Sequence, residues 1–396
     1  MSTPPIPAAE KPKKKRAIAI AIFIFLLIGI AYLVYWLFWG RFHEYTDDAY
    51  VDGNMVMITP QVPGIVTALT ALSTDFVPKG RVLVELDKTD ASIALDRSIA
   101  ELGSAVRQVQ QMFENVRTLQ ASTAMRKAQF IRAAQDYQRR MDLIDEGAVS
   151  TEDLQHSDAD VRTTYADLVA SEHSFIAALS LVENTSIDSH PLVEQAKNQV
   201  RDAYVFLQRC TITAPVTGIV AQRTVQVGER VNPAQPLMAI VPLDQMWITA
   251  NFKEVQLGKM RVGQPAKVTA DMYGNDVVYH GTVVGIGGGT GSVFSALPPQ
   301  NATGNWIKIV QRIPVKIDVP EEMIQQHPLR LGLSMEVTVD IEQTDCPIIP
   351  AIKAPQPIYV TDVFASQEWG AEALIEEVIQ ENLTPHFLQD MGVNEE

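Results

Sequence analysis

Two long heptad-repeat segments occupy the centre of this 396-residue chain. In the first, apolar residues are spaced alternately three and four apart, as in a coiled-coil seam. They are Ile99, Leu102, Val106, Val109, Phe113 and Val116, and further on Phe130, Ala134, Tyr137, Met141 and Ile144. Neither Gly nor Pro interrupts residues 104–146. The pattern predicts one helix over residues 90–145, roughly 80 Å long at about 1.5 Å per residue.

A helix stop and a helix start follow this segment closely. Gly147 is a typical residue for ending a helix. Ser150, with Asp153 three residues later, is an N-terminal capping pattern, although Asp replaces the usual Glu or Gln. The chain is therefore predicted to reverse direction near residues 146–150.

The second segment returns with the same heptad spacing. Its apolar residues are Leu154, Val161, Tyr165, Leu168, Phe175, Leu179 and Val182. His190 and Pro191 predict a break, after which the helical pattern resumes. Two long helices joined by a short turn are antiparallel neighbours. Residues 89–209 are thus predicted to form an α-helical coiled-coil hairpin.

A β pattern flanks the hairpin on both sides. Residues 56–88 and 210–243 each contain a Pro followed by Gly-Ile-Val, at 64–66 and 218–220, and each ends in a short apolar strand after a glycine turn. This is an internal repeat split by the hairpin. The two halves are therefore predicted to pair into one β domain.

The remaining segments are simpler. Residues 40–55 look like a short connector. Residues 244–345 alternate apolar and polar side chains between glycine turns, which predicts a small antiparallel β-barrel. After them, 346–396 form a Pro-rich linker and an acidic tail, in which 371–382 have an amphipathic helical pattern. That helix is expected to be either mobile or docked.

An uncharged apolar run at residues 17–39 predicts a transmembrane anchor. It is long enough to cross a bilayer of about 30 Å and ends in aromatic residues suited to a membrane interface. Residues 1–16 hold five basic side chains, which favours a cytoplasmic N-terminus and a bulk outside the cytoplasm. The alternative is a cleaved signal peptide, whose apolar core is usually shorter and ends in small residues.

Composition argues against several functions. The net charge of −15 disfavours nucleic-acid binding. The seven histidines are scattered, with no metal-ligand spacing, and no nucleophile motif is present. The glycine run 285–291 lacks the Lys and Ser or Thr of a phosphate-binding loop, so a loop between barrel strands is favoured. Cys210 and Cys346 show no metal spacing and are either a pair or two separate thiols.

Three segments carry a resemblance to a known family. They are 47–51 (DDAYV), 246–254 (MWITANFKE) and above all 289–317 (GTGSVFSALPPQNATGNWIKIVQRIPVKI). With the order of anchor, half domain, hairpin, half domain and barrel, the chain resembles the HlyD-type membrane fusion proteins, within them the EmrA multidrug-export branch. The split repeat resembles the two halves of a biotinyl/lipoyl-like domain. The resemblance implies an elongated, modular, mixed α and β fold.

The resemblance also implies a function. The chain would be the periplasmic adaptor of a tripartite multidrug efflux pump, anchored in the inner membrane of a Gram-negative bacterium. Its partners would be an inner-membrane major-facilitator drug/proton antiporter, a TolC-like outer-membrane channel and further copies of itself in a homo-oligomeric ring. It would be no enzyme and use no cofactor. Arg139, Leu143 and Ser150 fit the family's R-x₃-L-x₆-S pattern, which implies that the hairpin tip docks the channel.

Three other functions remain open. The first is an adaptor for an ABC-type exporter of proteins or peptides. The second is a lipoyl-type carrier subunit, which would need a modified lysine such as Lys88; this residue is expected to enter the helix unmodified. The third is a coiled-coil tethering protein without a transport role. The alternative to docking at the tip is that Arg139 is a solvated residue, Leu143 a core residue and Ser150 a simple cap.

Overall fold

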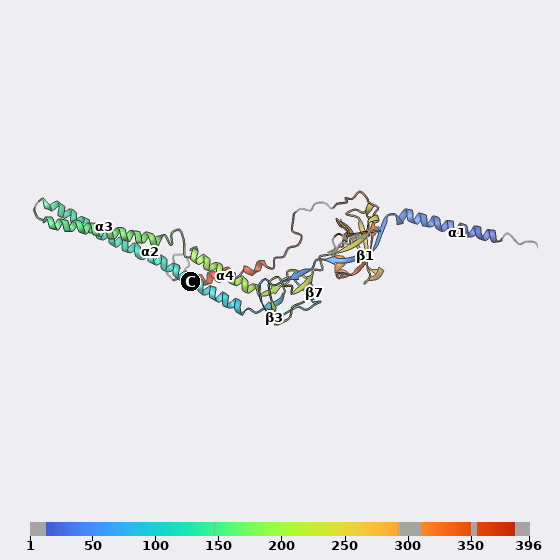
Figure 1. Cartoon of the computed structure of the whole chain (residues 1–396), viewed down its shortest axis with the longest axis horizontal. Helices are drawn as coiled ribbons and strands as arrows, with labels where there is room; N and C mark the ends of the chain where they lie inside the picture. Colours follow the sequence, from blue (N-terminus) through green and yellow to red (C-terminus); the bar gives the residue numbers. More distant parts are fainter. Residues whose placement is uncertain (1–12, 146, 292, 294–309, 350–354, 385–396) are drawn as a thin grey trace, which may run out of the picture.

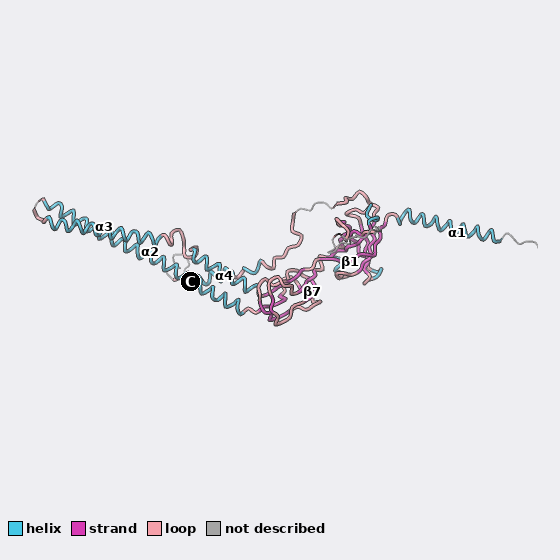
Figure 2. Tube along the Cα trace, viewed as in Figure 1, coloured by secondary structure: helices cyan, strands magenta, loops and turns pink. Residues whose placement is uncertain are grey.

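The computed structural model describes residues 13–145, 147–291, 293, 310–349 and 355–384. Figure 1 shows an extended molecule with the first helix at one end and the turn of the helical hairpin at the other. Between them lie two separate groups of strands, which are magenta in Figure 2. The expected elongated, modular mixture of α and β elements is confirmed.

The first helix stands apart from the rest of the molecule. It comprises α1 (Lys13–Tyr35) and a π-helical continuation, η1 (Trp36–Gly40). The segment Ile18–Phe38 is the one described helical stretch that is long and apolar enough to cross a membrane. All of its side chains are exposed in the described part of the structure. Apolar surface left bare on this scale is stable in a lipid environment and costly in water.

The strands next to the anchor form a closed six-stranded barrel. They are β1 (His43–Gly53), β10 (Met246–Lys253), β11 (Pro265–Ala270), β12 (Val278–Ile286), β13 (Arg312–Asp318) and β14 (Ser334–Asp340). All neighbours are antiparallel, in the closed order β1-β10-β13-β12-β11-β14. Burial along β10 alternates strictly, and Phe252 and Tyr279 are among the fully buried side chains. Short helical turns connect the strands: η2 (Glu254–Lys259), η3 (Gly274–Asp276) and α5 (Glu321–Gln326).

The interpretation of residues 40–55 as a connector is wrong for most of that segment. Strand β1 pairs with both β10 and β14 and closes the barrel. Its inward-facing residues Thr46, Ala49 and Val51 are small or of moderate size, and its outward face carries acidic side chains. The acids made a half-buried strand look like a polar linker.

The split β domain lies between the barrel and the hairpin. Its first half contains β2 (Val56–Ile58), β3 (Gly64–Leu69), β4 (Phe76–Val77) and β5 (Val82–Leu86); its second half contains β6 (Thr211–Thr213), β7 (Gly218–Arg223), β8 (Arg230–Val231) and β9 (Met238–Val241). The two sheets have the orders β2-β9-β7-β4 and β6-β5-β3-β8. Each sheet takes two strands from each half, so the repeat does fold as one unit.

The hairpin leaves this domain from adjacent strands. Strand β5 leads into α2 (Thr89–Ile144), and β6, its antiparallel neighbour, follows α4 (Pro191–Arg209). The outer part of α2 packs against α3 (Thr151–Leu179) and the inner part against α4. The helix predicted over 90–145 is therefore present almost to the residue.

The break in the return helix starts earlier than expected. Helix α3 ends at Leu179, so Val182 lies outside it, and regular helix resumes only at Pro191. Asn184 has φ +60°, a conformation that ends helices, and the serines of this segment hydrogen-bond locally. His190 caps α4, because its Nδ1 accepts from Leu192 N at 3.2 Å. The heptad pattern hid this stop because Val182 keeps the spacing.

The tail folds back along the molecule. After the barrel, the described part of the tail includes η4 (Ala365–Glu368) and α6 (Ala371–Asn382). Helix α6 packs against α2 and α4 near the base of the hairpin, as Figure 1 shows. Of the two expectations for this segment, docking is the one observed.

Candidate functional site at the hairpin tip

The hairpin tip is a tight reversal between α2 and α3. Gly147 has φ +70°, which glycine adopts without strain, and its N–H donates to Ile144 O at 3.0 Å. Ala148 N then donates to Leu143 O at 3.4 Å. These bonds satisfy carbonyls at the end of α2 and turn the chain within a few residues.

Ser150 starts the return helix. Its Oγ accepts from Asp153 N at 3.0 Å and donates to the Asp153 carboxylate at 2.6 Å. The bond from the Ser150 hydroxyl holds the pKa of Asp153 below its usual value. The predicted capping role of Ser150 is therefore confirmed.

Arg139 and Leu143 lie one helical turn apart on the last turns of α2, so they share a face of that helix. The Arg139 side chain is 70% exposed and forms an ion pair with Asp136 on its own helix. Leu143 is 42% exposed, so it is not a core residue. An exposed ion pair of this kind is weak in water, and the guanidinium is available for a partner's acceptors.

The sequence did not predict that two further residues belong to the tip surface. Met141 is 49% exposed and adds apolar surface on a different face of α2 from Leu143, although its heptad position predicted burial. Arg140 reaches across the turn, and its guanidinium donates to Asp153 O at 3.2 Å. This contact links the end of α2 to the start of α3 beside the turn. A basic residue just before a helix stop is the only signal the sequence offered for it.

The barrel holds two of the three family segments in defined roles. Asp48, on β1, accepts from Tyr50 Oη at 2.6 Å, from Asn251 at 3.2 Å and from Arg312 at 2.7 Å. These contacts connect three adjacent strands. Partial burial acts to raise the pKa of Asp48, but the three hydrogen bonds and the Arg312 charge lower it overall. Trp247 lies on β10 and Lys316 on the neighbouring strand β13. Lys316 Nζ is 3.5 Å from the centre of the Trp247 ring.

The third segment, 289–317, lies largely outside the described residues. The glycine run 285–291 is described and begins at the end of strand β12. Within the described part, Gly287 N donates to Pro314 O at 2.8 Å beside the barrel strands. Lys88 is the N-cap residue of α2 and its side chain is exposed. Cys210 and Cys346 are not bonded to each other, and burial raises the pKa of the Cys210 thiol. No cluster of metal-ligating side chains occurs among the described residues.

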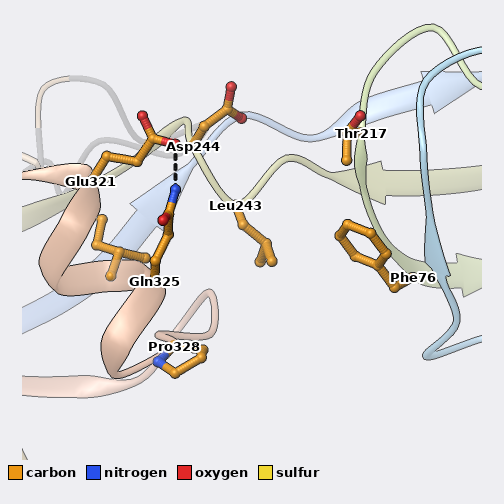
Figure 3. Close-up of a pocket in the computed structure, with 8 residues that line it drawn as sticks. Phe76, Thr217, Leu243, Asp244, Glu321, Gln325 and Pro328 are labelled. Atoms are coloured by element: carbon orange, nitrogen blue, oxygen red, sulfur yellow. Dashed lines mark hydrogen bonds between the residues drawn. The ribbon is translucent and has the colours of Figure 1, made fainter.

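A second candidate site lies where the split β domain meets the barrel. It is a cleft of about 400 Å³, and its lining residues are Phe76, Thr217, Leu243, Asp244, Glu321, Ile324, Gln325 and Pro328. Figure 3 shows Asp244 and Glu321 toward one end of the cleft and Phe76 toward the other. Gln325 donates to the Glu321 carboxylate at 2.9 Å. The sequence could not predict this cleft, because its walls come from four separate segments.

Comparisons with known proteins agree with this architecture. A family model described as "EMRA, alpha-helical hairpin domain" matches residues 89–210. The chain is 43% identical over 380 residues to the multidrug export protein EmrA of Escherichia coli, covering 96% of this chain and 97% of that protein. The chain belongs to the EmrA family of membrane fusion proteins.

Other relatives are similar over shorter stretches. The fatty acid resistance protein FarA of Neisseria gonorrhoeae is 45% identical over 308 residues, 76% of this chain and 77% of that protein. Among solved structures, the periplasmic adaptor protein EmrA matches 76% of this chain and 98% of its own, at 19% identity and a TM-score of 0.38. MacA from Actinobacillus actinomycetemcomitans matches 76% of this chain and 80% of its own, at 22% identity and a TM-score of 0.44.

Proposed function

We propose that this EmrA-family protein is the periplasmic adaptor of a tripartite multidrug efflux pump. The observation that carries the proposal is the linear order of its parts. A bare apolar helix stands at one end, a barrel and a split β domain follow, and a long hairpin ends in an exposed tip. Such a molecule suits a bridge from one membrane to a distant partner.

The anchor's place beside the barrel supports an inner-membrane origin for this bridge. Five basic side chains precede the apolar run 17–39, which favours a cytoplasmic N-terminus and a periplasmic bulk. In this arrangement the barrel stands near the membrane, next to an inner-membrane major-facilitator drug/proton antiporter. The protein contributes no catalysis and holds no cofactor; its role is to assemble the pump and form the conduit.

The hairpin tip is the proposed contact with a TolC-like outer-membrane channel. Leu143 supplies exposed apolar surface, Arg139 supplies a long cationic donor, and Ser150 caps the helix that follows the turn. One tip offers a small contact area and hence low affinity. A homo-oligomeric ring of adaptors would present several tips at once, and this multivalency would give a stable assembly.

Drug accumulation tests the proposal in cells that lack the gene. They are complemented with wild type, with the tip variant Arg139→Asp/Leu143→Ser, or with the matched control Arg132→Asp/Ile131→Ser. The control makes the same kinds of change at exposed positions of α2 about four turns before the hairpin turn. Each variant's level in the inner-membrane fraction is measured in parallel.

We expect deletion to raise accumulation of hydrophobic drugs, and wild type and control to restore efflux while the tip variant does not. Restoration by the tip variant would reject the docking site and leave the adaptor role intact. Unchanged accumulation across drugs and uncouplers would reject the drug-efflux role. Loss of protein or peptide secretion in the same cells would then support an adaptor for an ABC-type exporter.

A further inference from the structure

The C-terminal segment touches each of the three periplasmic parts of the molecule in turn. At the barrel, Pro347 O accepts from Val262 N at 2.9 Å. At the split β domain, Thr361 Oγ1 donates to Pro215 O at 2.8 Å. Beside it, Lys79 Nζ and the Asp362 carboxylate form an ion pair at 2.6 Å. Figure 1 shows the described residues 355–383, in orange to red, running toward the hairpin.

The attachment to the hairpin is a helix packed into an apolar groove. Helix α6 buries Ala371, Ile375, Val378 and Ile379, and Leu383 is buried just beyond it. These side chains share one core with residues of both hairpin arms, namely Leu102, Val106, Val109, Val193, Ala196 and Val200. The base of the hairpin is therefore a three-helix bundle, whereas its outer part has two helices.

Polar contacts fix the direction and register of α6. Arg201 makes a two-point contact with Glu372, at 2.5 Å and 3.1 Å. At the other end, Asn382 O accepts from Gln110 at 2.8 Å, and the Asn382 side chain accepts from Arg107. Gly103 provides the space for this end, because a Cβ there would lie 2.9 Å from the Asn382 amide nitrogen. Helix α2 thus has a binding site that fits the C-terminal end of α6.

We propose that residues 355–383 are a strap that holds the hairpin at a fixed angle to the split β domain. Without it, the junction between these two parts depends on chain connections and a limited interface, and such domains normally move relative to one another. With it, a third segment ties the split β domain directly to both arms of the hairpin base. Movement of the split β domain would then reach the hairpin tip with little loss to bending at this junction.

The first test measures hairpin mobility in the full-length protein in lipid nanodiscs. Ile375→Asp/Ile379→Asp should undock α6, and Ala373→Asp/Gln380→Asp is the matched control on the exposed face of the same helix. Burial of each isoleucine favours docking by a factor of about ten or more. Loss of both should therefore raise the equilibrium constant for undocking roughly 100-fold. Spin labels at Gln120 and Gln222, both exposed, report the distance from the hairpin to the split β domain after both native cysteines are replaced by serine.

We expect a broad distance distribution for the undocked variant and a narrow one for wild type and control. An equally narrow distribution in an undocked protein would overturn the strap. Faster hydrogen exchange in the hairpin base identifies undocking independently. This readout does not involve transport, so it stands even if the proposed efflux function fails.

A second test uses Gly103→Cys/Asn382→Cys, again without the native cysteines. The close approach of these positions suits a disulfide, which would lock α6 in place. This arm rests on the proposed efflux function. A fixed strap predicts normal efflux when locked and reduced efflux when undocked. Loss of efflux on locking, restored by reducing agent, would overturn the proposal, because it would mean that α6 must release during transport.

Discussion

The Ser150 cap gives a prediction whose size follows from the structure. Ser150→Ala removes the oxygen that accepts from Asp153 N at 3.0 Å, at a helix start where the backbone N–H groups have no helical partners. Loss of a serine cap costs about 1 kcal/mol. The equilibrium for local opening of the first turn of α3 should therefore increase about five-fold.

Hydrogen exchange at single amides in the full-length protein measures this change. The Asp153 amide should exchange about five-fold faster in Ser150→Ala. Ser150→Thr is the matched control, since threonine keeps the hydroxyl and should leave exchange nearly unchanged. Amides in the middle of α2 should not respond in either variant. Unchanged exchange at Asp153 in the alanine variant would refute the capping argument.

Efflux measurements with the same variants separate the two roles of Ser150. If the residue acts by shaping the tip, Ser150→Thr retains efflux and Ser150→Ala lowers it in proportion to the loosening of the turn. Full efflux with Ser150→Ala, despite faster exchange, would exclude Ser150 from the docking role and leave Arg139 and Leu143 as the candidates.

Three further predictions concern the parts behind the tip. Gly218→Ala should destabilise the split β domain by about 1–3 kcal/mol, because its Cβ would lie 2.3 Å from Val241 O. The repeat-equivalent Gly64→Ala should cost less, since it meets only the Leu86 side chain at 3.2 Å; hydrogen exchange in the sheets compares the two. For Asp48, the depressed folded-state pKa means that its stabilisation is present above the unfolded pKa of about 4 and is lost as pH falls through the lower folded value. Urea unfolding should therefore show a steeper loss of barrel stability at acid pH in wild type than in Asp48→Asn. Lys197→Met should destabilise the hairpin base by about 1 kcal/mol in urea unfolding at neutral pH, because the ammonium bonds two carboxylates there.

The parts predictable from sequence are those with a long, self-consistent pattern. The unbroken heptads of α2 determined its length, and Gly147 and Ser150 marked the turn. The split repeat predicted one domain from two distant segments, since neither half can bury its apolar face alone.

The missed features depended on tertiary partners. Strand β1 carries acids on its outer face, so only its pairing with β10 and β14 reveals it as part of the barrel. The amphipathic pattern of 371–382 predicted a helix but gave no information on what covers its apolar face. At the tip, the heptad rule predicted burial for Met141, but few neighbours remain to bury it where two helices end.

The insertion point of the hairpin has an evolutionary consequence. Both arms leave from β5 and β6, which are hydrogen-bonded neighbours, so the entire rod is a spacer added at one place on a complete small domain. Seven residues added to each arm would preserve every apolar contact and advance the tip by about 10 Å. The length of the hairpin would then change in steps of one heptad per arm. Relatives could match periplasms of different depth by changing this length alone, leaving the membrane-proximal machinery and the tip unaltered.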